Sequence, residues 1–361
     1  MTLNWLYLFF LFAANGICSP RHRQKTWESN LPLYNEPEEI NLNDFAHEVR
    51  WPNNLIGVAS WPEWKDSTVR QVTGLGTNTR GDVVVFHRGT REWGVRSFDR
   101  SNKFRGHGPI KQNTIVTLTN STGTKISAFG ANLFFLPHGL TVDHEDNIWT
   151  TDVGLHQVMK FPPGATKPSM ILGTRLLPGN DKSHFCKPTD VEVASNGDFF
   201  VADGYCNSRV VKFAKNGTVL SYIGETSQLK VVHSIALVEQ LDRLYVADRE
   251  NRRILCFKAG LKNEHEAGEF VSSFAKRRLG RIFALKYDPN MNVLYVVSQL
   301  MGRGLGSTID LLNGEVIANW PTAHYPRDNS LPHDLAVAPN GQAVYVADIR
   351  QERNPLFKLQ Y

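Results

Sequence analysis

One short pattern recurs six times along the chain, and it limits the possible folds more than any other feature of the sequence. Each copy has an apolar segment, a turn that often contains Asn or Gly, and a second β-rich segment that usually ends in Asp. The copies begin at Val72, His138, Thr189, His233, Arg281 and His333, and the first and fifth are degenerate. A third apolar segment follows the closing Asp of four copies, at 157–161, 209–213, 253–257 and 356–359.

The spacing of these copies indicates an all-β fold. In the regular copies 14 or 15 positions separate the first residue from the closing Asp, as between His138 and Asp152 or His333 and Asp348. Short strands with turn signals that repeat at this period are typical of propeller blades. A blade buries its faces only against its neighbours, and closing the ring removes exposed strand edges. We therefore predict a six-bladed β-propeller over residues 46–361, built from repeats that resemble the NHL repeat.

Charge and hydropathy exclude some classes of partner. The formal net charge is +5, without a basic block, which argues against nucleic acid. No internal stretch stays apolar over the ~18 residues that a membrane-spanning helix needs. We expect a monomer that spans no membrane.

Residues 1–18 have the pattern of a signal peptide. Their apolar core is residues 4–13, and the small residues Gly16 and Cys18 precede a possible cleavage site. The polar segment 19–45 is expected to form a loosely ordered leader. The sequence therefore predicts a secreted protein or one in the lumen of the secretory pathway. Two sequons are typical of N-glycosylation there, at Asn120 and Asn216.

That compartment is oxidising, so the cysteines are expected to pair. Cys18 leaves with the signal peptide or flanks the cleavage site, and three cysteines remain. Cys186 and Cys206 are the natural pair because they close a short loop, and Cys256 would then be free.

Three histidines hold one structural position in alternate copies. His138, His233 and His333 open the innermost strands of blades 2, 4 and 6, which lie about 120° apart around the axis of a six-bladed ring. The other blades have different residues there: Val72, Thr189 and Arg281. Three neutral imidazoles with an open fourth position form a catalytic zinc arrangement. The alternative is a polar channel lining with unrelated histidines.

Other polar residues are predicted near the same axis. Asp334 offers hard oxygen ligands that suit calcium better than zinc, although a turn or capping role is the alternative. In a regular strand its side chain would point away from His333. The second strands mostly end in Asp with a structural turn role, and Arg88, Tyr205 and Arg249 near these ends are candidates for the rim of the axial site. Packed aromatic or surface ion-pair roles remain alternatives.

Several longer segments resemble peptidyl-α-hydroxyglycine α-amidating lyase. They are 86–89 (FHRG), 108–110 (GPI), 137–140 (PHGL), 184–186 (HFC), 188–191 (PTDV), 203–209 (DGYCNSR), 246–251 (VADREN) and 332–334 (PHD). The resemblance covers roughly residues 46–361. The copper monooxygenase half of the bifunctional amidating enzymes has no counterpart in this sequence. We therefore expect a monofunctional lyase whose substrates come from a separate copper monooxygenase.

The resemblance implies a role for each site residue. It implies catalytic zinc on His138, His233 and His333. It implies structural calcium on the carbonyls of Val72 and Leu140 and the carboxylate of Asp334. It implies a catalytic Tyr205, active-site arginines Arg88 and Arg249, and a Cys186–Cys206 disulfide. The second disulfide of the family does not carry over, because Tyr245 occupies the position of the partner of Cys256.

The implied activity is that of a peptidylamidoglycolate lyase, the second step of neuropeptide and peptide-hormone amidation. It cleaves the N–Cα bond of peptidyl-α-hydroxyglycine and yields an amidated peptide and glyoxylate. Tyr205 would act as the base, and the arginines would hold the substrate carboxylate. One alternative is a secreted, non-catalytic NHL propeller that binds peptides or proteins. Another is a calcium-dependent lactonase, which would need several acidic channel ligands where this chain has histidines.

Overall fold

The computed structural model describes residues 55–361 except 64, 65, 67, 275–278, 312, 323–329 and 351–354. The predicted signal peptide, the leader and the first residues of the predicted propeller lie outside this part of the chain. The described residues form 24 strands and three single-turn 3₁₀ helices. None of these helices is long and apolar enough to cross a membrane.

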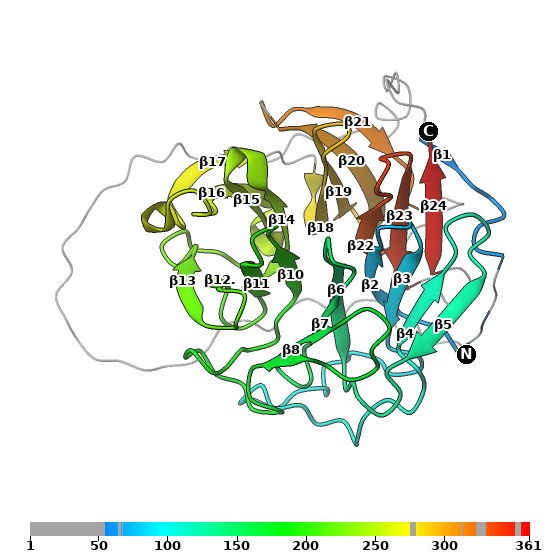
Figure 1. Cartoon of the computed structure of the whole chain (residues 1–361), viewed down its shortest axis with the longest axis horizontal. Coiled ribbons are helices and arrows are strands. Elements are labelled where there is room, and N and C mark those ends of the chain that lie inside the picture. Colours follow the sequence, from blue (N-terminus) through cyan, green and yellow to red (C-terminus); the bar gives the residue numbers. More distant parts are fainter. Residues whose placement is uncertain are drawn as a thin grey trace, which may run out of the picture. The chain divides into compact units, whose positions relative to one another are not determined.

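The strands form six four-stranded antiparallel sheets, each of which is one blade (Figure 1). Blade 1 contains β2 (Val72–Thr77), β3 (Val83–His87), β4 (Ile115–Leu118) and β5 (Lys125–Phe129). Blade 2 contains β6 (Pro137–Val142), β7 (Ile148–Asp152), β8 (Gln157–Phe161) and β9 (Met170–Leu172). Blade 3 contains β10 (Asp190–Val193), β11 (Phe199–Asp203), β12 (Arg209–Phe213) and β13 (Val219–Ile223).

The remaining blades follow the same order. Blade 4 contains β14 (Val232–Val238), β15 (Arg243–Asp248), β16 (Arg253–Lys258) and β17 (Phe270–Phe274). Blade 5 contains β18 (Arg281–Asp288), β19 (Val293–Leu300), β20 (Arg303–Asp310) and β21 (Val316–Trp320). Blade 6 contains β22 (Pro332–Val337), β23 (Ala343–Asp348), β24 (Leu356–Gln360) and β1 (Ile56–Gly57). The 3₁₀ helices are η1 (Glu239–Leu241), η2 (Arg249–Asn251) and η3 (Glu264–Glu266).

The ring closes through a strand from the opposite end of the propeller sequence. In blade 6, β1 pairs with β24, and Ile56 lies opposite Gln360. The innermost strands β2, β6, β10, β14, β18 and β22 contact one another in this order, and β22 contacts β2. The predicted six-bladed β-propeller is confirmed, with each blade at the predicted place in the sequence.

The hydrophobic core lies between the blades. Six clusters of buried residues each join two consecutive blades. Between blades 1 and 2, for example, Phe86 packs edge-on against Phe134, and Leu140 belongs to the same cluster. Burying a side chain of this size stabilises the fold by about 1.5–3 kcal/mol. Since each apolar face needs the next blade, stability and ring closure depend on each other.

The aspartates that end the second strands have the predicted structural role. Asp152 accepts a hydrogen bond from the backbone N–H of Leu136 at 3.0 Å, and Asp348 accepts one from Leu331 at 2.9 Å. Leu136 lies two residues before His138, and Leu331 lies two residues before His333. These carboxylates therefore hold the chain just before it enters the axial site.

Candidate functional site

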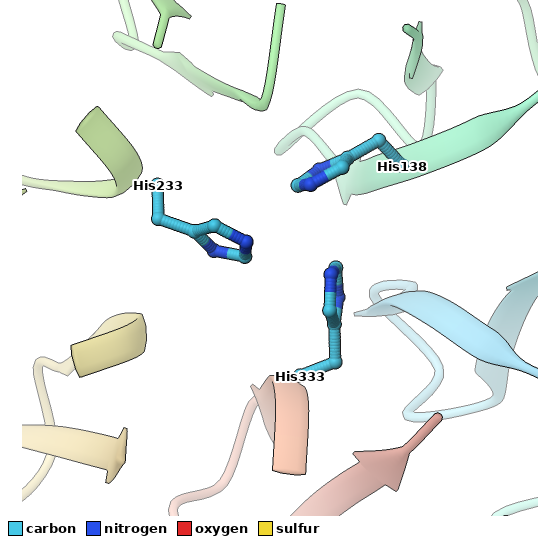
Figure 2. Close-up of side chains that lie close together, drawn as sticks. All are labelled: His138, His233 and His333. Carbon is cyan, nitrogen blue, oxygen red and sulfur yellow. The ribbon is translucent and has the colours of Figure 1, made fainter. Parts of the chain in front are cut away.

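Three imidazole rings meet on the axis of the propeller. His138, His233 and His333 lie in the inner strands β6, β14 and β22, and all three are buried. The distances between their ring centroids are 4.7, 4.8 and 4.8 Å, and each ring offers a nitrogen within 4.8 Å of the others. Figure 2 shows the rings converging from three different blades. The structure thus brings together the three histidines that the sequence pattern predicts.

A β-bulge directs each histidine into the axial cavity. In blade 6, His333 is one extra residue between the paired positions Pro332 and Asp334. The same shift of register occurs around His138 and His233. A bulge bends its strand and re-aims a side chain. As a result His333 and Asp334, which would face opposite ways in a regular strand, both line the cavity.

The bulges also correct the predicted alignment of the other blades. The extra residue of β2 is Thr73, not Val72, and that of β18 is Phe283, not Arg281. Thr73, Thr189 and Phe283 line the cavity together with the histidines. The prediction that Val72 and Arg281 occupy the position of the histidines in their blades is wrong, because residue types alone do not reveal a bulge. The same prediction for Thr189 is confirmed.

Each histidine is bound to the next blade through its Nδ1 atom. The nitrogen–oxygen distances are 2.9 Å from His138 to the Thr189 carbonyl, 2.7 Å from His233 to Phe283, and 2.8 Å from His333 to Thr73. A carbonyl oxygen only accepts hydrogen bonds, so each Nδ1 carries the hydrogen and donates it. The lone pair of each Nε2 is then available to the cavity, as it is in histidines that bind metals.

Burial keeps these rings neutral at physiological pH. Burial, followed by charged groups around the cavity, holds the pKa values of His138 and His233 well below the ordinary value. Burial lowers the pKa of His333 to about 3. Neutral imidazole is the form that binds zinc, and three such ligands leave a fourth position for a substrate. The donor set therefore fits a zinc ion.

Tyr205 reaches the histidines from the connection between β11 and β12. Its hydroxyl oxygen lies 3.0 Å from Nε2 of His138 and 3.2 Å from Nε2 of His233. The adjacent Cys206 forms a disulfide with Cys186, whose Cα atom is 5.4 Å away. The predicted pairing is confirmed, and it restrains the connection that carries Tyr205.

Arg88 follows β3 directly and is buried beside the same group. Its Nε donates to the Pro137 carbonyl at 2.8 Å, and its Nη2 has no hydrogen-bond partner among the described residues. Burial lowers the pKa of Arg88 to about 10, so the guanidinium stays charged at neutral pH. A buried cation with an unused N–H group is a strong donor to a carboxylate.

Arg249 follows β15 and packs against two aromatic rings. Its Cζ lies 5.3 Å from the ring centroid of Tyr205 and 5.2 Å from that of Phe283. Its Nη1 donates to the Tyr205 hydroxyl at 3.4 Å. The carboxylate of Glu250 accepts a hydrogen bond from Arg249 Nε at 2.9 Å and also binds Arg281. One carboxylate therefore fixes both guanidinium groups near Tyr205.

The predicted calcium residues lie on three neighbouring inner strands. Val72 begins β2, Leu140 lies in β6 and Asp334 lies in β22, and all three are buried. The Asp334 carboxylate accepts the backbone N–H of Leu75 at 2.7 Å and that of Leu335 at 2.8 Å. Burial raises the pKa of this carboxyl group well above its ordinary value. The positive charge of Lys286 opposes this rise, and the carboxylate oxygens of Asp334 are hard donors of the kind that calcium binds.

Cys256 is a buried free thiol, as predicted. It lies directly opposite Tyr245 in the pairing of β16 with β15. Burial raises the pKa of the Cys256 thiol to about 11, so the unreactive thiol form predominates.

The two sequons differ in accessibility. Asn216 is exposed in the turn between β12 and β13. Asn120 is half-buried in the turn between β4 and β5, and its Nδ2 donates to the Arg80 carbonyl at 3.4 Å.

Trp93 and Glu250 belong to this site although no sequence pattern identified them as such. The ring centroid of Trp93 lies 4.7 Å from that of Tyr205 and 6.3 Å from that of His138. Trp93 lies in the connection 88–114, outside the repeated segments, so periodicity carries no information about it. The unusual length of that connection is the one signal that could have found it.

Similar proteins align with most of this chain. The NHL repeat model matches residues 185–213, in blade 3. Peptidyl-alpha-hydroxyglycine alpha-amidating lyase 2 of Drosophila melanogaster is 42% identical over 331 residues, which cover 90% of this chain and 79% of that protein. A probable peptidyl-alpha-hydroxyglycine alpha-amidating lyase of Caenorhabditis elegans is 41% identical, over 79% of this chain and 81% of that protein.

Two further similarities support less about this chain, because one relative is much longer and one solved structure has low sequence identity. Peptidyl-glycine alpha-amidating monooxygenase A of Xenopus laevis is 41% identical over 78% of this chain, which spans only 31% of that protein. A solved structure of a putative gluconolactonase matches with a TM-score of 0.56 at 12% identity, over 86% of this chain and 93% of that chain. At this identity the likeness concerns the fold alone.

Proposed function

This chain belongs to the peptidyl-α-hydroxyglycine α-amidating lyase family and is a lyase of the amidation pathway, and from that premise we propose that it cleaves the N–Cα bond of peptides ending in α-hydroxyglycine. The products are a C-terminally amidated peptide and glyoxylate. The substrate hydroxyl loses its proton, and its oxygen becomes the aldehyde oxygen of glyoxylate. The electron pair of the broken C–N bond passes to the amide nitrogen, which gains a proton.

One observation supports this function above the others. Three neutral histidines with available Nε2 lone pairs and the hydroxyl of Tyr205 share one buried axial site. We propose that His138, His233 and His333 hold zinc, which would supply Lewis acidity toward the substrate hydroxyl. A propeller that only bound peptides would not need this combination of donors.

We assign Tyr205 as the group that takes the proton of the substrate hydroxyl. Its oxygen lies beside two histidine Nε2 atoms and accepts a hydrogen bond from Arg249, so it is positioned to exchange a proton with a hydroxyl group held at the histidines. Since the reaction as a whole neither consumes nor releases a proton, the same hydroxyl can return the proton to the amide nitrogen.

Arg88 and Arg249 are proposed to hold the carboxylate of the hydroxyglycine. Arg88 offers a buried Nη2 with no protein partner among the described residues, and Arg249 is held beside Tyr205 by Glu250. Charge-assisted hydrogen bonds from guanidinium groups orient a carboxylate well. They would place the hydroxyl and the scissile bond next to Tyr205.

The remaining proposals concern the structural metal, the secretion of the enzyme and the source of its substrate. Calcium would be structural, held by Val72, Leu140 and Asp334 near the axis. The apolar segment 4–13 supports secretion, and Asn216 is the better exposed of the two sequons. The bifunctional relatives are named monooxygenases, so we propose that a separate copper monooxygenase supplies the hydroxylated peptide to this chain.

Glyoxylate release tests the function directly. Purified protein is incubated with a synthetic α-hydroxyglycine-extended peptide, before and after chelation and after zinc is restored. We expect equal amounts of glyoxylate and amidated peptide, loss of both on chelation, and recovery with zinc. The variant His233→Ala should stay inactive when zinc is added. Absence of glyoxylate from folded, zinc-loaded protein would overturn the proposal and favour a peptide-binding propeller.

A further inference from the structure

The connection between the second and third strands of blade 1 is far longer than its counterparts. It contains 27 residues, 88–114, whereas blades 2, 3, 4 and 5 use four, five, four and two residues. Tyr205 and Arg249 lie in the corresponding connections of blades 3 and 4. The long connection therefore starts at the same end of the blades as the candidate active site.

This connection is fixed to the two blades that follow it. Lys187, just before blade 3, donates to Asn102 Oδ1 at 2.8 Å, and its Nζ lies 4.2 Å from the ring centroid of Phe98. Arg91 donates to the carbonyl of Phe135, just before blade 2, at 3.0 Å. Ordering a connection of this length has a high entropic cost, and these contacts hold it in one arrangement.

Besides Arg88, this connection brings Trp93 to the site. Its indole ring centroid lies 4.7 Å from that of Tyr205 and 6.3 Å from that of His138. The Cζ of Arg88 lies 5.5 Å from the same centroid, and the ring of Phe98 packs at 5.4 Å. Trp93 is nevertheless only half-buried. Part of the surface of the indole is therefore accessible to a ligand.

We propose that Trp93 forms an aromatic subsite for the residue that precedes the hydroxyglycine, and that it favours aromatic and large apolar side chains there. The proposal rests on the proposed function, which places the substrate carboxylate at Arg88 and the hydroxyl at Tyr205. Trp93 borders both of these residues, so a peptide bound there lies within reach of its indole ring. A ring offered there stacks on the indole and removes apolar surface from water.

Two matched substrates test this subsite: acetyl-Phe-hydroxyglycine and acetyl-Ser-hydroxyglycine. We expect the wild type to prefer the Phe substrate in kcat/KM by about tenfold, the scale set by partial burial of one aromatic side chain. In Trp93→Ala this preference should nearly vanish, with a larger rise in KM for the Phe substrate than for the Ser substrate. Trp93→Phe should keep part of the preference because it retains a ring.

Binding of unreactive analogues provides a second measurement. Acetyl-Phe-Gly and acetyl-Ser-Gly keep the carboxylate and the amide but lack the hydroxyl, so calorimetry gives their Kd values without turnover. The ratio of the two Kd values should follow the kinetic preference in each variant. Val95→Ala is the matched control, because Val95 lies in the same connection and is 79% exposed, and it should leave both ratios unchanged.

The outcomes separate the subsite from the activity. If folded Trp93→Ala keeps the wild-type ratio between the Phe and Ser ligands in both measurements, the proposed subsite is refuted. This holds even if activity and affinity fall equally toward both ligands. If the wild type releases no glyoxylate from either substrate, the proposed function fails. The Kd ratios then still decide whether Trp93 selects the side chain.

Discussion

His333 donates from Nδ1 to the carbonyl oxygen of Thr73 at 2.8 Å, across 260 positions of sequence and at the junction where the last blade meets the first. Blade 6 is completed by β1, which comes from the same end of the propeller sequence as Thr73. The contact that closes the ring therefore also orients the third histidine. A ligand that binds only the closed ring should stabilise the whole propeller.

Metal removal is expected to lower the stability of the protein. At a free zinc concentration of 100 times Kd, binding adds about 2.7 kcal/mol to the free energy of unfolding. Calorimetry before and after treatment with a chelator that removes zinc but not calcium should show a fall in Tm that zinc reverses. In His333→Ala the difference should disappear, whereas the exposed His144→Ala should behave as the wild type. The same Tm with and without chelator in zinc-loaded wild type would contradict the zinc site.

Tyr205→Phe should remove most of the turnover and keep the metal. Loss of a positioned acid or base lowers the rate by about 10²–10⁴-fold, so we expect kcat to fall in that range. Zinc content, measured by elemental analysis, should stay at the wild-type level. Tyr222→Phe, in β13, is the control and should retain wild-type kcat. Full activity of Tyr205→Phe would refute the role as base.

Arg88→Lys tests the proposed contact with the carboxylate. Lysine keeps the charge but loses the planar pair of N–H groups, and we expect kcat/KM to fall by about 10–100-fold for a contact of this kind. A substrate whose carboxylate is replaced by a carboxamide should lose little between wild type and variant. The exposed Arg80→Lys is the control. An equal loss on both substrates would point to a structural defect instead.

Stability should fall with acid through His156, which is fully buried and accepts the Lys187 N–H at Nδ1. Burial lowers the pKa of His156 to about 4. Its depressed pKa means that the unfolded chain takes up a proton near pH 6.5 and the folded one only near pH 4. The contribution of His156 to the free energy of unfolding is therefore fully present above pH 6.5. It is lost as the pH falls toward 4, and the loss is at most about 3 kcal/mol.

Urea unfolding at several pH values between 4 and 7 measures this dependence. His156→Gln keeps a hydrogen-bond acceptor without titrating, so its stability should vary less over that range. The exposed His144→Gln should retain the wild-type slope. Parallel curves for wild type and His156→Gln would contradict the assignment.

Tyr245→Cys should allow a second disulfide, because Tyr245 lies opposite Cys256 in the pairing of two neighbouring strands. Closing a loop of this length adds about 3 kcal/mol by the chain-entropy estimate, less any strain and the lost packing of the tyrosine ring. Mass spectrometry should detect the bond, and Tm should fall when the variant is reduced. Tyr245→Ser serves as the control for the lost ring. Two free thiols in oxidised Tyr245→Cys would contradict the prediction.

Much of the fold and part of the site follow from local patterns. Strand alternation and turn residues occur within each copy of the repeat, so the six blades could be predicted without knowing how they pack. The alternation of His138, His233 and His333 also depends only on the period of the repeat and the symmetry of a ring. The pairing of Cys186 with Cys206 could be predicted because the two residues are close in sequence.

Other features depend on packing between blades and could not be predicted from the sequence. The bulges that make Thr73 and Phe283 the cavity-lining residues change the register by one residue, and such a shift has no signature in residue types. Trp93 lies outside every repeat, and only the docking of its connection on blades 2 and 3 brings it to Tyr205. Glu250 lies in the segment 246–251 that carries the family resemblance, but only the fold places Arg281 beside it.

Periodicity along the chain is enough to predict the all-β class, the number of blades and the three histidines. The orientation of each imidazole depends instead on the tertiary structure, because each Nδ1 donates to a carbonyl on the following blade. The tertiary structure also determines which groups surround Tyr205. These contacts join residues that are distant in sequence, and their geometry exists only once the ring has closed.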